Sequence, residues 1–291
     1  MIAIIGGRAT GKTHYIVALI HRLTHAVGPN LAITVTPLGD ESQERWIEDF
    51  YTPLFKQHTV LQPTQPSAID YRVKAPLIFR LHIGKGRQSR VLNLSLFDTA
   101  GEDMTSNATL STYSNYICGA DGIIFLLDPL QMSGIRQKMS SAQLPPTDPS
   151  ASPENIVRAL RELFERVNHI SPQQKLKTPV AFTLSKTDAI ADILDDPGSP
   201  ILQSSNHIGR LGLNEIQSLH TDINHRLQDW LSPNFCNYIE ENFANYNYFG
   251  ISSLGKQPNT RGHIDNVSPR RVEEPFLWLL YRNHLIKGQA R

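Results

Sequence analysis

A glycine-rich octapeptide near the start of the chain limits the folds that this sequence can adopt. Residues 1–5 (MIAII) predict a short buried strand, and residues 6–13 (GGRATGKT) follow it at once and fit the pattern G-x-x-x-x-G-K-[ST]. The residues after the octapeptide predict a helix to about Val27. This order of strand, turn and helix predicts a phosphate-binding loop, because loop N–H groups and a helix N-terminus both attract anions.

Each residue of the octapeptide has an expected contact with the phosphates or their metal ion. The Lys12 ammonium is expected to reach the β- and γ-phosphates, and the Thr13 hydroxyl is expected to ligate Mg²⁺. The backbone of the other positions is expected to surround the phosphates: Gly6, Gly7, Arg8, Ala9, Thr10 and Gly11. The sequence therefore predicts that the chain binds a nucleoside triphosphate with Mg²⁺.

A second segment of this kind begins at residue 91. Residues 91–97 alternate apolar and polar side chains, which predicts a strand with one buried face, and they run into residues 98–103 (DTAGED). Asp98 at the end of such a strand can hold Mg²⁺ through water, and the Gly101 N–H can contact the γ-phosphate. This segment is therefore expected to contribute to the metal and phosphate sites.

Two more strand ends indicate the base. Residues 179–184 form an apolar run that ends in residues 185–188 (SKTD), and the Asp188 carboxylate can accept hydrogen bonds from N1–H and N2–H₂ of guanine. Adenine offers no such pair of donors, so it would leave the buried carboxylate unpaired. Residues 246–251 predict a last strand, after which the backbone can meet the guanine O6 at Ser252, Ser253 and Leu254.

Taken in order, GGRATGKT, DTAGED, SKTD and SSLG resemble the phosphate, Mg²⁺, guanine and base-supporting motifs of the Ras-like, translation-factor-class P-loop GTPases. The resemblance spans about residues 1–255 and implies GTP and GDP as ligands, with Mg²⁺ as the cofactor. It also implies that Ser185, Lys186 and Asp188 surround the base. The family usually has Asn or Thr where Ser185 stands, and Ser keeps a hydroxyl group at that position.

Alternating strands and helices predict an α/β fold, here a three-layer P-loop fold with helices on both faces of a mostly parallel sheet. A hairpin across residues 84–87 is expected to supply one antiparallel edge strand. Strands are expected at residues 1–5, 31–36, 76–83, 91–97, 122–128, 179–184 and 246–251. Helices are expected at residues 13–27, 41–56, 105–118, 153–168, 214–230 and 274–286.

At 291 residues, the chain is expected to form a single enlarged domain over residues 1–291. Three stretches look like insertions, at about residues 37–75, 129–152 and 189–213, and they are where a surface for protein partners is expected. The formal charge of +1 gives no reason to expect nucleic acid or an anionic membrane. Two widely spaced cysteines, and no apolar run of about eighteen residues, favour a cytoplasmic protein.

The residues for hydrolysis are less clearly marked than those for binding. The resemblance implies a switch threonine that meets Mg²⁺ and the γ-phosphate; Thr64 is favoured, and Thr36 and Thr59 are alternatives. Glu102 stands where Ras-like proteins commonly have Gln, so it can position the attacking water, or it can simply be an acid at a helix N-terminus. Arg8 can reach the transferring phosphoryl group, or it can face solvent or a partner.

These features predict a GTPase that hydrolyses GTP to GDP and phosphate as a molecular switch, with slow intrinsic turnover. One alternative is an interaction or scaffold module that holds the nucleotide with negligible hydrolysis, and another is an ATPase, which only Ser185 suggests. The long insertion before Asp98 and the apolar, proline-containing C-terminal helix also resemble bacterial double-GTPase-type proteins of conflict or defence systems. That resemblance implies protein partners in a multiprotein assembly.

Overall fold

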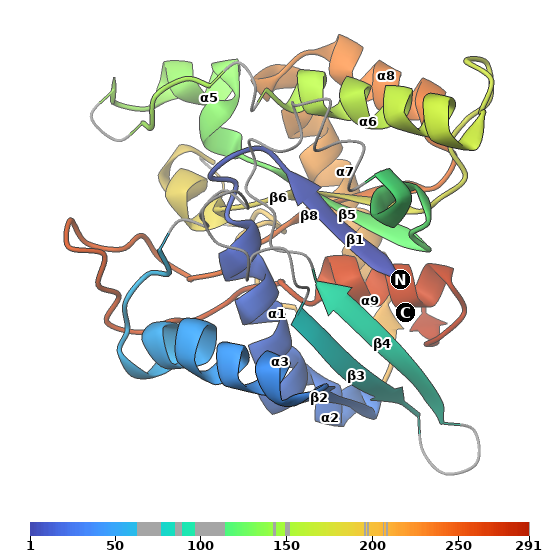
Figure 1. Ribbon diagram of the computed structural model, residues 1–291. Helices are drawn as coiled ribbons and strands as arrows, with labels where there is room; N and C mark the ends of the chain where they lie inside the picture. Colours follow the sequence, from blue (N-terminus) through green and yellow to red (C-terminus); the bar gives the residue numbers. More distant parts are fainter. Residues whose placement is uncertain are drawn as a thin grey trace.

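The computed structural model describes residues 1–62, 77–84, 89–96, 114–141, 144–148, 152–194, 196, 198–205, 207 and 209–290. A parallel sheet lies at the centre of these residues, in the strand order β1-β5-β6-β8. Its strands are β1 (Ile2–Gly6), β5 (Gly122–Leu127), β6 (Val180–Leu184) and β8 (Tyr246–Gly250), as Figure 1 shows. Nearly all of their residues are buried, as expected for strands that are covered by helices on both faces.

The registers of the parallel strands align their carboxyl ends at one edge of the sheet. Gly6 of β1 lies opposite Leu126 of β5, and Leu127 lies opposite Leu184 of β6. Leu184 in turn lies opposite Gly250 of β8. The loops that leave β1, β5, β6 and β8 therefore start within about one residue of one another, at the edge where open α/β sheets bind ligands.

A second, antiparallel sheet has the order β2-β3-β4 and consists of β2 (Ile33–Pro37), β3 (Leu77–Ile83) and β4 (Arg90–Leu96). The expected hairpin is present, with Ile83 of β3 opposite Arg90 of β4. Figure 1 shows β4 beside β1 and running in the same direction. Strand β3 is therefore antiparallel to both of its neighbours, β2 and β4. Residues 33–37 of β2 alternate buried and exposed side chains, so one face of this strand packs against the core.

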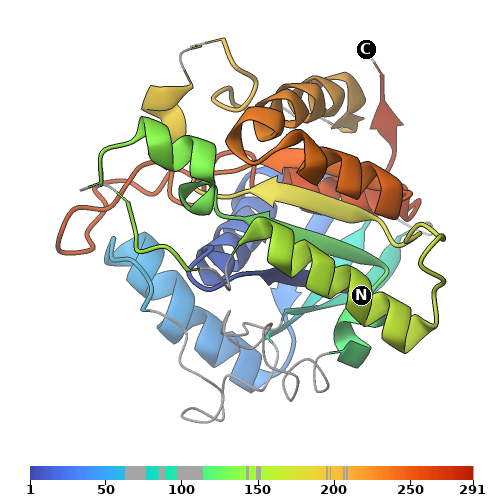
Figure 2. The same ribbon diagram turned by 90° about the horizontal axis from the view of Figure 1, so that it is seen from above.

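Helices cover both faces of the parallel sheet (Figure 1 and Figure 2), which confirms the expected α/β class. Helices α1 (Lys12–His25) and α9 (Glu274–Arg282) lie on one face, and α6 (Pro153–Asn168), α7 (Leu213–Trp230) and α8 (Pro233–Asn242) lie on the other. Smaller elements are α2 (Val27–Leu31), α5 (Ser133–Lys138), η5 (Pro129–Gln131), η8 (Thr187–Ile193), β7 (Leu211–Gly212) and β9 (Gly288–Gln289).

The first expected insertion contains a long helix between β2 and β3. Helix α3 (Asp40–Arg45) continues without a break into η1 (Trp46–Lys56), which is a π-helix, with hydrogen bonds between residues five apart. Pro53 lies inside η1 and has no N–H to donate, so regular α-helical bonding is interrupted there. Trp46 packs edge-on against Phe79 of β3, which fixes this helix against the antiparallel sheet.

Helix α9 fills one face of the parallel sheet rather than lying on the surface. Its residues from Glu274 to Leu280 are all buried, and it packs against β5 and β6. The packing is close, because a Cβ atom at Gly122 of β5 would lie only 2.9 Å from Leu279 Cδ2. The fit suits a glycine at the start of β5, since a side chain there would require Leu279 to shift.

Both cysteines are packed as expected. Cys118 and Cys236 are free thiols with buried side chains, and burial raises the pKa of the Cys118 thiol to about 11. Such thiols are poor nucleophiles, because only the thiolate reacts readily. Among the described residues, no helix combines the length and the apolar character that crossing a membrane requires.

Candidate functional site

The loop between β1 and α1 has the backbone shape of an anion-binding site. The φ angles of Ala9 (57°) and Gly11 (87°) are positive, and that of Thr10 between them is not. Alternation of this kind turns successive N–H groups toward one concave side, which suits a phosphate. Gly6 lets the loop leave the sheet closely, because a Cβ atom there would lie 2.9 Å from the carbonyl oxygen of Leu126.

Two side chains form hydrogen bonds with the backbone of this loop. Lys12 Nζ donates to the carbonyl oxygens of Gly6 and Gly7, both at 3.0 Å, and the Thr10 hydroxyl donates to Gly7 O at 2.9 Å. Lys12 is only 6% exposed, so its charge acts inside the loop rather than in solvent. Thr13 lies in the first turn of α1, where its hydroxyl can hold Mg²⁺. These residues fit a bound phosphate and its metal ion, and Arg8 beside them has an exposed side chain.

The carboxylate expected to recognise guanine is oriented by the loop after β8. The Ser252 hydroxyl donates to Asp188 Oδ1 at 2.5 Å and accepts a hydrogen bond from the Gly255 N–H at 2.7 Å. Ser252 is fully buried, and its own N–H donates to the carbonyl oxygen of Arg270 at 3.1 Å. Ser253 and Leu254, which follow, are partly exposed and border the same region.

Ser185 takes little direct part in this arrangement. Its hydroxyl donates to the carbonyl oxygen of Leu127 at 3.2 Å, toward β5 and into the sheet. Its N–H donates to the same oxygen at 2.9 Å. The Ser185 hydroxyl is therefore engaged within the sheet, and Asp188 stays the residue of this loop that is expected to contact the base.

Lys186 is held by a residue that sequence reasoning missed. Lys186 has a left-handed φ of 52°, and its Nζ lies 2.7 Å from Oδ2 of Asp128, whose side chain is 2% exposed. The other carboxylate oxygen of Asp128 accepts the N–H of Leu130 at 3.0 Å and caps the short helix η5. The available signal was an acidic residue directly after the apolar strand β5, which is the position that the other motif residues occupy after their strands.

His14 also joins the site without having been predicted. It follows Thr13 in α1, and its Nε2 accepts a hydrogen bond from the Leu61 N–H at 3.1 Å. Burial, with a further contribution from the Lys186 charge, lowers the pKa of His14 to about 4, so the imidazole is neutral at pH 7. A neutral imidazole that accepts at Nε2 carries its proton on Nδ1.

Several predicted residues cannot be placed. Thr64, Asp98, Gly101 and Glu102 lie outside the described residues, so their roles stay predictions. The two alternatives to Thr64 are described. Thr36 is exposed near the end of β2, opposite Arg80, and the Thr59 hydroxyl donates to the carbonyl oxygen of Gln57 at 3.2 Å. Both threonines are thus engaged in other local structure.

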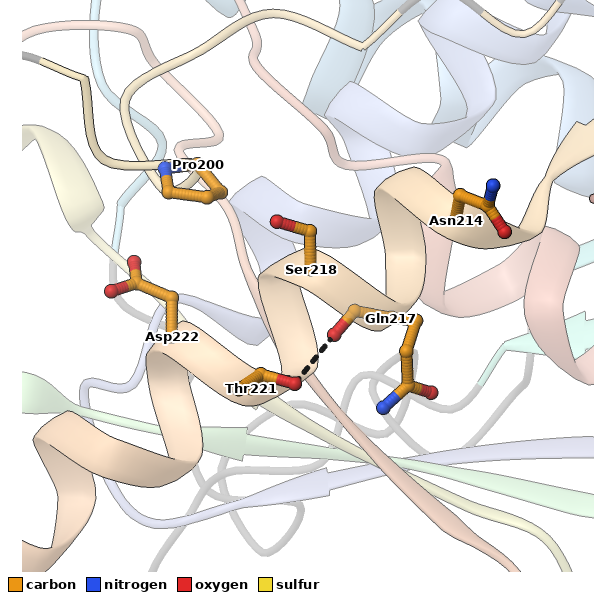
Figure 3. Close-up of a pocket in the computed structure, with 6 residues that line it drawn as sticks. All are labelled: Pro200, Asn214, Gln217, Ser218, Thr221 and Asp222. Carbon is orange, nitrogen blue, oxygen red and sulfur yellow. Dashed lines mark hydrogen bonds between the residues drawn. The ribbon is translucent and has the colours of Figure 1, made fainter. Parts of the chain in front are cut away.

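An open pocket of about 460 Å³ lies on α7, apart from the motif residues (Figure 3). Five of its six lining residues have polar side chains, and the Thr221 hydroxyl donates to the carbonyl oxygen of Gln217 in the preceding turn at 3.0 Å. Its lining residues are Pro200, Asn214, Gln217, Ser218, Thr221 and Asp222. None of the sequence-predicted site residues lines this pocket.

Comparison with known proteins agrees with this geometry. The sequence model of a family described as Double-GTPase 2 matches residues 1–257. A protein of Mycolicibacterium smegmatis (strain ATCC 700084 / mc(2)155), named "Putative ESX-1 scaffolding and assembly protein SaeC", is 26% identical over 298 residues. The alignment covers 96% of this chain and 73% of that protein.

Proposed function

This chain belongs to the Double-GTPase 2 family, and we propose that it binds Mg²⁺–GTP and hydrolyses it to GDP and phosphate as a switch for protein partners. The observation that carries the proposal is the convergence of the phosphate loop, Asp188 and Ser252 at one edge of the parallel sheet. The loop suits the phosphates, and the oriented carboxylate suits the N1–H and N2–H₂ donors of guanine.

The proposed roles follow the chemistry of each side chain. Lys12 neutralises charge on the β- and γ-phosphates, and Thr13, with Asp98 and Thr64, holds Mg²⁺. Mg²⁺ supplies charge neutralisation between the β- and γ-phosphates when it is bound. Hydrolysis transfers the γ-phosphoryl group to water and leaves GDP, with Glu102 to orient that water; Gly101 and Arg8 contact the phosphoryl group.

The second candidate function is a scaffold that holds the nucleotide with negligible hydrolysis. The relative from Mycolicibacterium smegmatis carries "scaffolding and assembly" in its name, which favours a role in assembly for this chain as well. In either case the protein partners bind the switch segments, at residues 37–75 and 98–112, or the other insertions, at about residues 129–152 and 189–213, in a multiprotein assembly. The GTP substrate and the two free thiols support a cytoplasmic location, which is part of the proposal.

A binding assay with Mg²⁺–GTP, Mg²⁺–GDP and Mg²⁺–ATP tests the proposal, followed by phosphate release under single-turnover conditions. We expect binding of both guanine nucleotides, little binding of ATP, and release of phosphate that Lys12→Ala abolishes. Lys175→Ala, which removes an exposed lysine far along the chain, is the matched control. Equal binding of ATP would contradict the guanine assignment, and binding without phosphate release from the wild type would favour the scaffold.

Glu102→Gln and Arg8→Ala separate the parts of the proposed hydrolysis. We expect Arg8→Ala to slow phosphate release with little effect on GDP affinity, if the guanidinium contacts the phosphoryl group only as it is transferred. Glu102→Gln keeps a group that can orient water and removes a negative charge near the γ-phosphate. Unchanged phosphate release in both variants would contradict a catalytic role for either side chain.

A further inference from the structure

Residues 57–62, here called the strap, connect η1 to residues outside the described part of the chain and are held from two sides. On one side, the Leu61 N–H donates to His14 Nε2 at 3.1 Å. On the other side, the Val60 N–H donates to Gly262 O at 2.9 Å, and the Ile264 N–H donates to His58 O at 2.8 Å. The strap therefore joins two parts of the molecule that are far apart in sequence.

The second partner of the strap is the loop of residues 255–268, here called the base-side loop. It begins at Gly255, whose N–H donates to the Ser252 hydroxyl that orients Asp188. At its far end, the Ser268 N–H donates to Leu254 O at 2.9 Å, so both ends of the loop are fixed at the base-recognition turn. Ser252 is thus hydrogen-bonded directly to the loop that holds the strap.

The first partner of the strap is fixed to the phosphate loop. His14 is the residue after Thr13, in the first turn of α1, and α1 begins at Lys12. The Nε2 atom of the His14 ring accepts the Leu61 N–H at 3.1 Å, which attaches the strap to this turn of the helix. The strap is therefore hydrogen-bonded on one side to the helix that carries Lys12 and Thr13, and on the other to the base-side loop, which contacts the Ser252 that orients Asp188.

A glycine makes the second contact possible. Gly262 has a φ of +74°, and a Cβ atom there would lie 2.9 Å from Val60 Cγ2. A larger residue would both strain the backbone and push Val60 away from the base-side loop. The close approach of the strap and this loop therefore depends on the absence of a side chain at residue 262.

We propose that His14 and Gly262 are positioning residues that hold the strap to both halves of the nucleotide site, so that nucleotide release requires the strap to detach. The inference rests on the proposed function, since it assigns to that site a structural device that controls nucleotide release. Through the strap, the base side of the site is connected to the phosphate side by hydrogen bonds that lie outside the central sheet.

The test measures dissociation of fluorescently labelled GDP from the Mg²⁺-loaded full chain. His14→Phe keeps a ring of similar size and removes the acceptor, whereas His14→Gln restores an acceptor at a similar reach. Gly262→Ala attacks the strap from the other side. Gly209→Ala is the matched control, because Gly209 has a φ of +71° and nothing within 4 Å of its Cβ position.

We expect His14→Phe and Gly262→Ala each to speed GDP release by about fivefold, the size expected for one hydrogen bond between neutral groups. His14→Gln and Gly209→Ala should release GDP at close to the wild-type rate. Hydrogen–deuterium exchange should rise in residues 57–62 and not in β5 or β6, since these strands lie in the central sheet.

Three results would overturn the inference. If the wild type binds GDP and both variants release it at the wild-type rate, the inference fails and the proposed function stands. If exchange rises equally across β5 and β6 in both variants, they loosen the whole fold and the positioning role is wrong. If the wild type binds neither GDP nor GTP, the proposed function fails and the inference fails with it.

Discussion

The Ser252 hydroxyl donates to the Asp188 carboxylate at 2.5 Å across 64 positions of sequence. The bond joins the ends of two neighbouring parallel strands, because Ser252 and Asp188 follow β8 and β6, which pair along their whole length. One oxygen of the carboxylate is thereby fixed, and its orientation is set before any base arrives. Such preorganisation reduces the free energy that binding would otherwise spend on ordering a side chain.

We expect Asp188→Asn to change the preferred nucleotide from GTP to xanthosine triphosphate. The amide can donate where the carboxylate only accepts, and xanthine presents an acceptor in place of the N2–H₂ donor of guanine. Loss of GTP affinity should be at least about a hundredfold, because a hydrogen bond to a charged group is lost and a donor is left unpaired. Competition binding with the two triphosphates measures the change, and retained preference for GTP would contradict the assignment.

Removing the hydroxyl that orients Asp188 should have a smaller effect. Ser252→Ala is expected to weaken GDP affinity by about five- to tenfold, less than the full worth of a hydrogen bond to a charged group, because the hydroxyl orients the carboxylate and does not itself contact the base. Ser253→Ala, one residue later, serves as the control because, in the described part of the chain, the side chain hydrogen-bonded to Asp188 is that of Ser252, and residue 253 is expected to meet the base through its backbone. Titration calorimetry distinguishes the two variants, and equal affinities would show that the bond does not position the carboxylate.

The pair of Lys186 and Asp128 predicts a stability difference that depends on which partner is removed. Asp128 is 2% exposed and Lys186 is 30% exposed, at an N–O distance of 2.7 Å. Lys186→Met leaves a buried carboxylate without its counter-ion and should lower the free energy of unfolding by about 1–3 kcal/mol, less than for a fully buried pair. Adding Asp128→Asn should recover most of that loss in urea unfolding, while GDP affinity stays reduced.

A buried charge cluster near the start of α9 allows a sharper test. Arg271 Nη1 donates to Glu274 Oε1 at 2.7 Å, and His207 Nε2 lies 3.1 Å from the same oxygen. Burial alone would raise the pKa of Glu274, but the His207 hydrogen bond and the Arg271 charge outweigh it and lower the pKa. Arg271→Met should therefore cost about 3–5 kcal/mol of unfolding free energy, because Glu274 is left without its cation.

The double variant Arg271→Met/Glu274→Gln is expected to recover most of this loss, since no buried charge then stays unpaired. Lys256→Met is the control, because the ion pair of Lys256 with Asp265 is 50% and 86% exposed on its two sides. It should change the unfolding free energy by less than about 0.5 kcal/mol. Equal losses for Lys256→Met and Arg271→Met would contradict the stated importance of burial.

The depressed pKa of His14 predicts that stability falls in mild acid. Its pKa is about 4 in the folded chain and about 6.5 in the unfolded chain, so the unfolded chain binds more protons between these values. The contribution is fully present above about pH 6.5 and is lost as the pH falls toward 4, by at most about 3 kcal/mol. His14→Phe should flatten the pH dependence of urea unfolding in this range; an unchanged slope would contradict the shift.

Local patterns predicted most of the fold, because the strands are buried on both faces and read as short apolar runs. The helix expected at residues 153–168 is Pro153–Asn168 in the structure, and the strand expected at 246–251 is Tyr246–Gly250. Helix α8 was missed, although Ser232 and Pro233 are a good start signal and the Ser232 hydroxyl accepts the Phe235 N–H. The helix is short and follows α7 after only two residues, so no break in composition marks it.

The sequence predicted the site residues only where they form a motif of consecutive residues. The phosphate loop and SKTD are each written in one stretch of sequence, and their strands bring them to one edge by a general rule of parallel sheets. Asp128 and His14 meet Lys186 and Leu61 across 58 and 47 positions. Such contacts depend on the three-dimensional path of the loops, and no spacing or periodicity in the sequence encodes that path.

The part of the chain that matches the family model is shorter than the part that packs into the folded domain, as helix α9 shows. The family match ends at residue 257, before α9 begins at Glu274. Yet the helix fills a face of the central sheet, and its Leu279 lies where any side chain on Gly122 would have to go. A chain shortened to the matched residues would bare an apolar surface of β5 and β6 to water, so a fragment chosen by homology alone is expected to aggregate rather than fold.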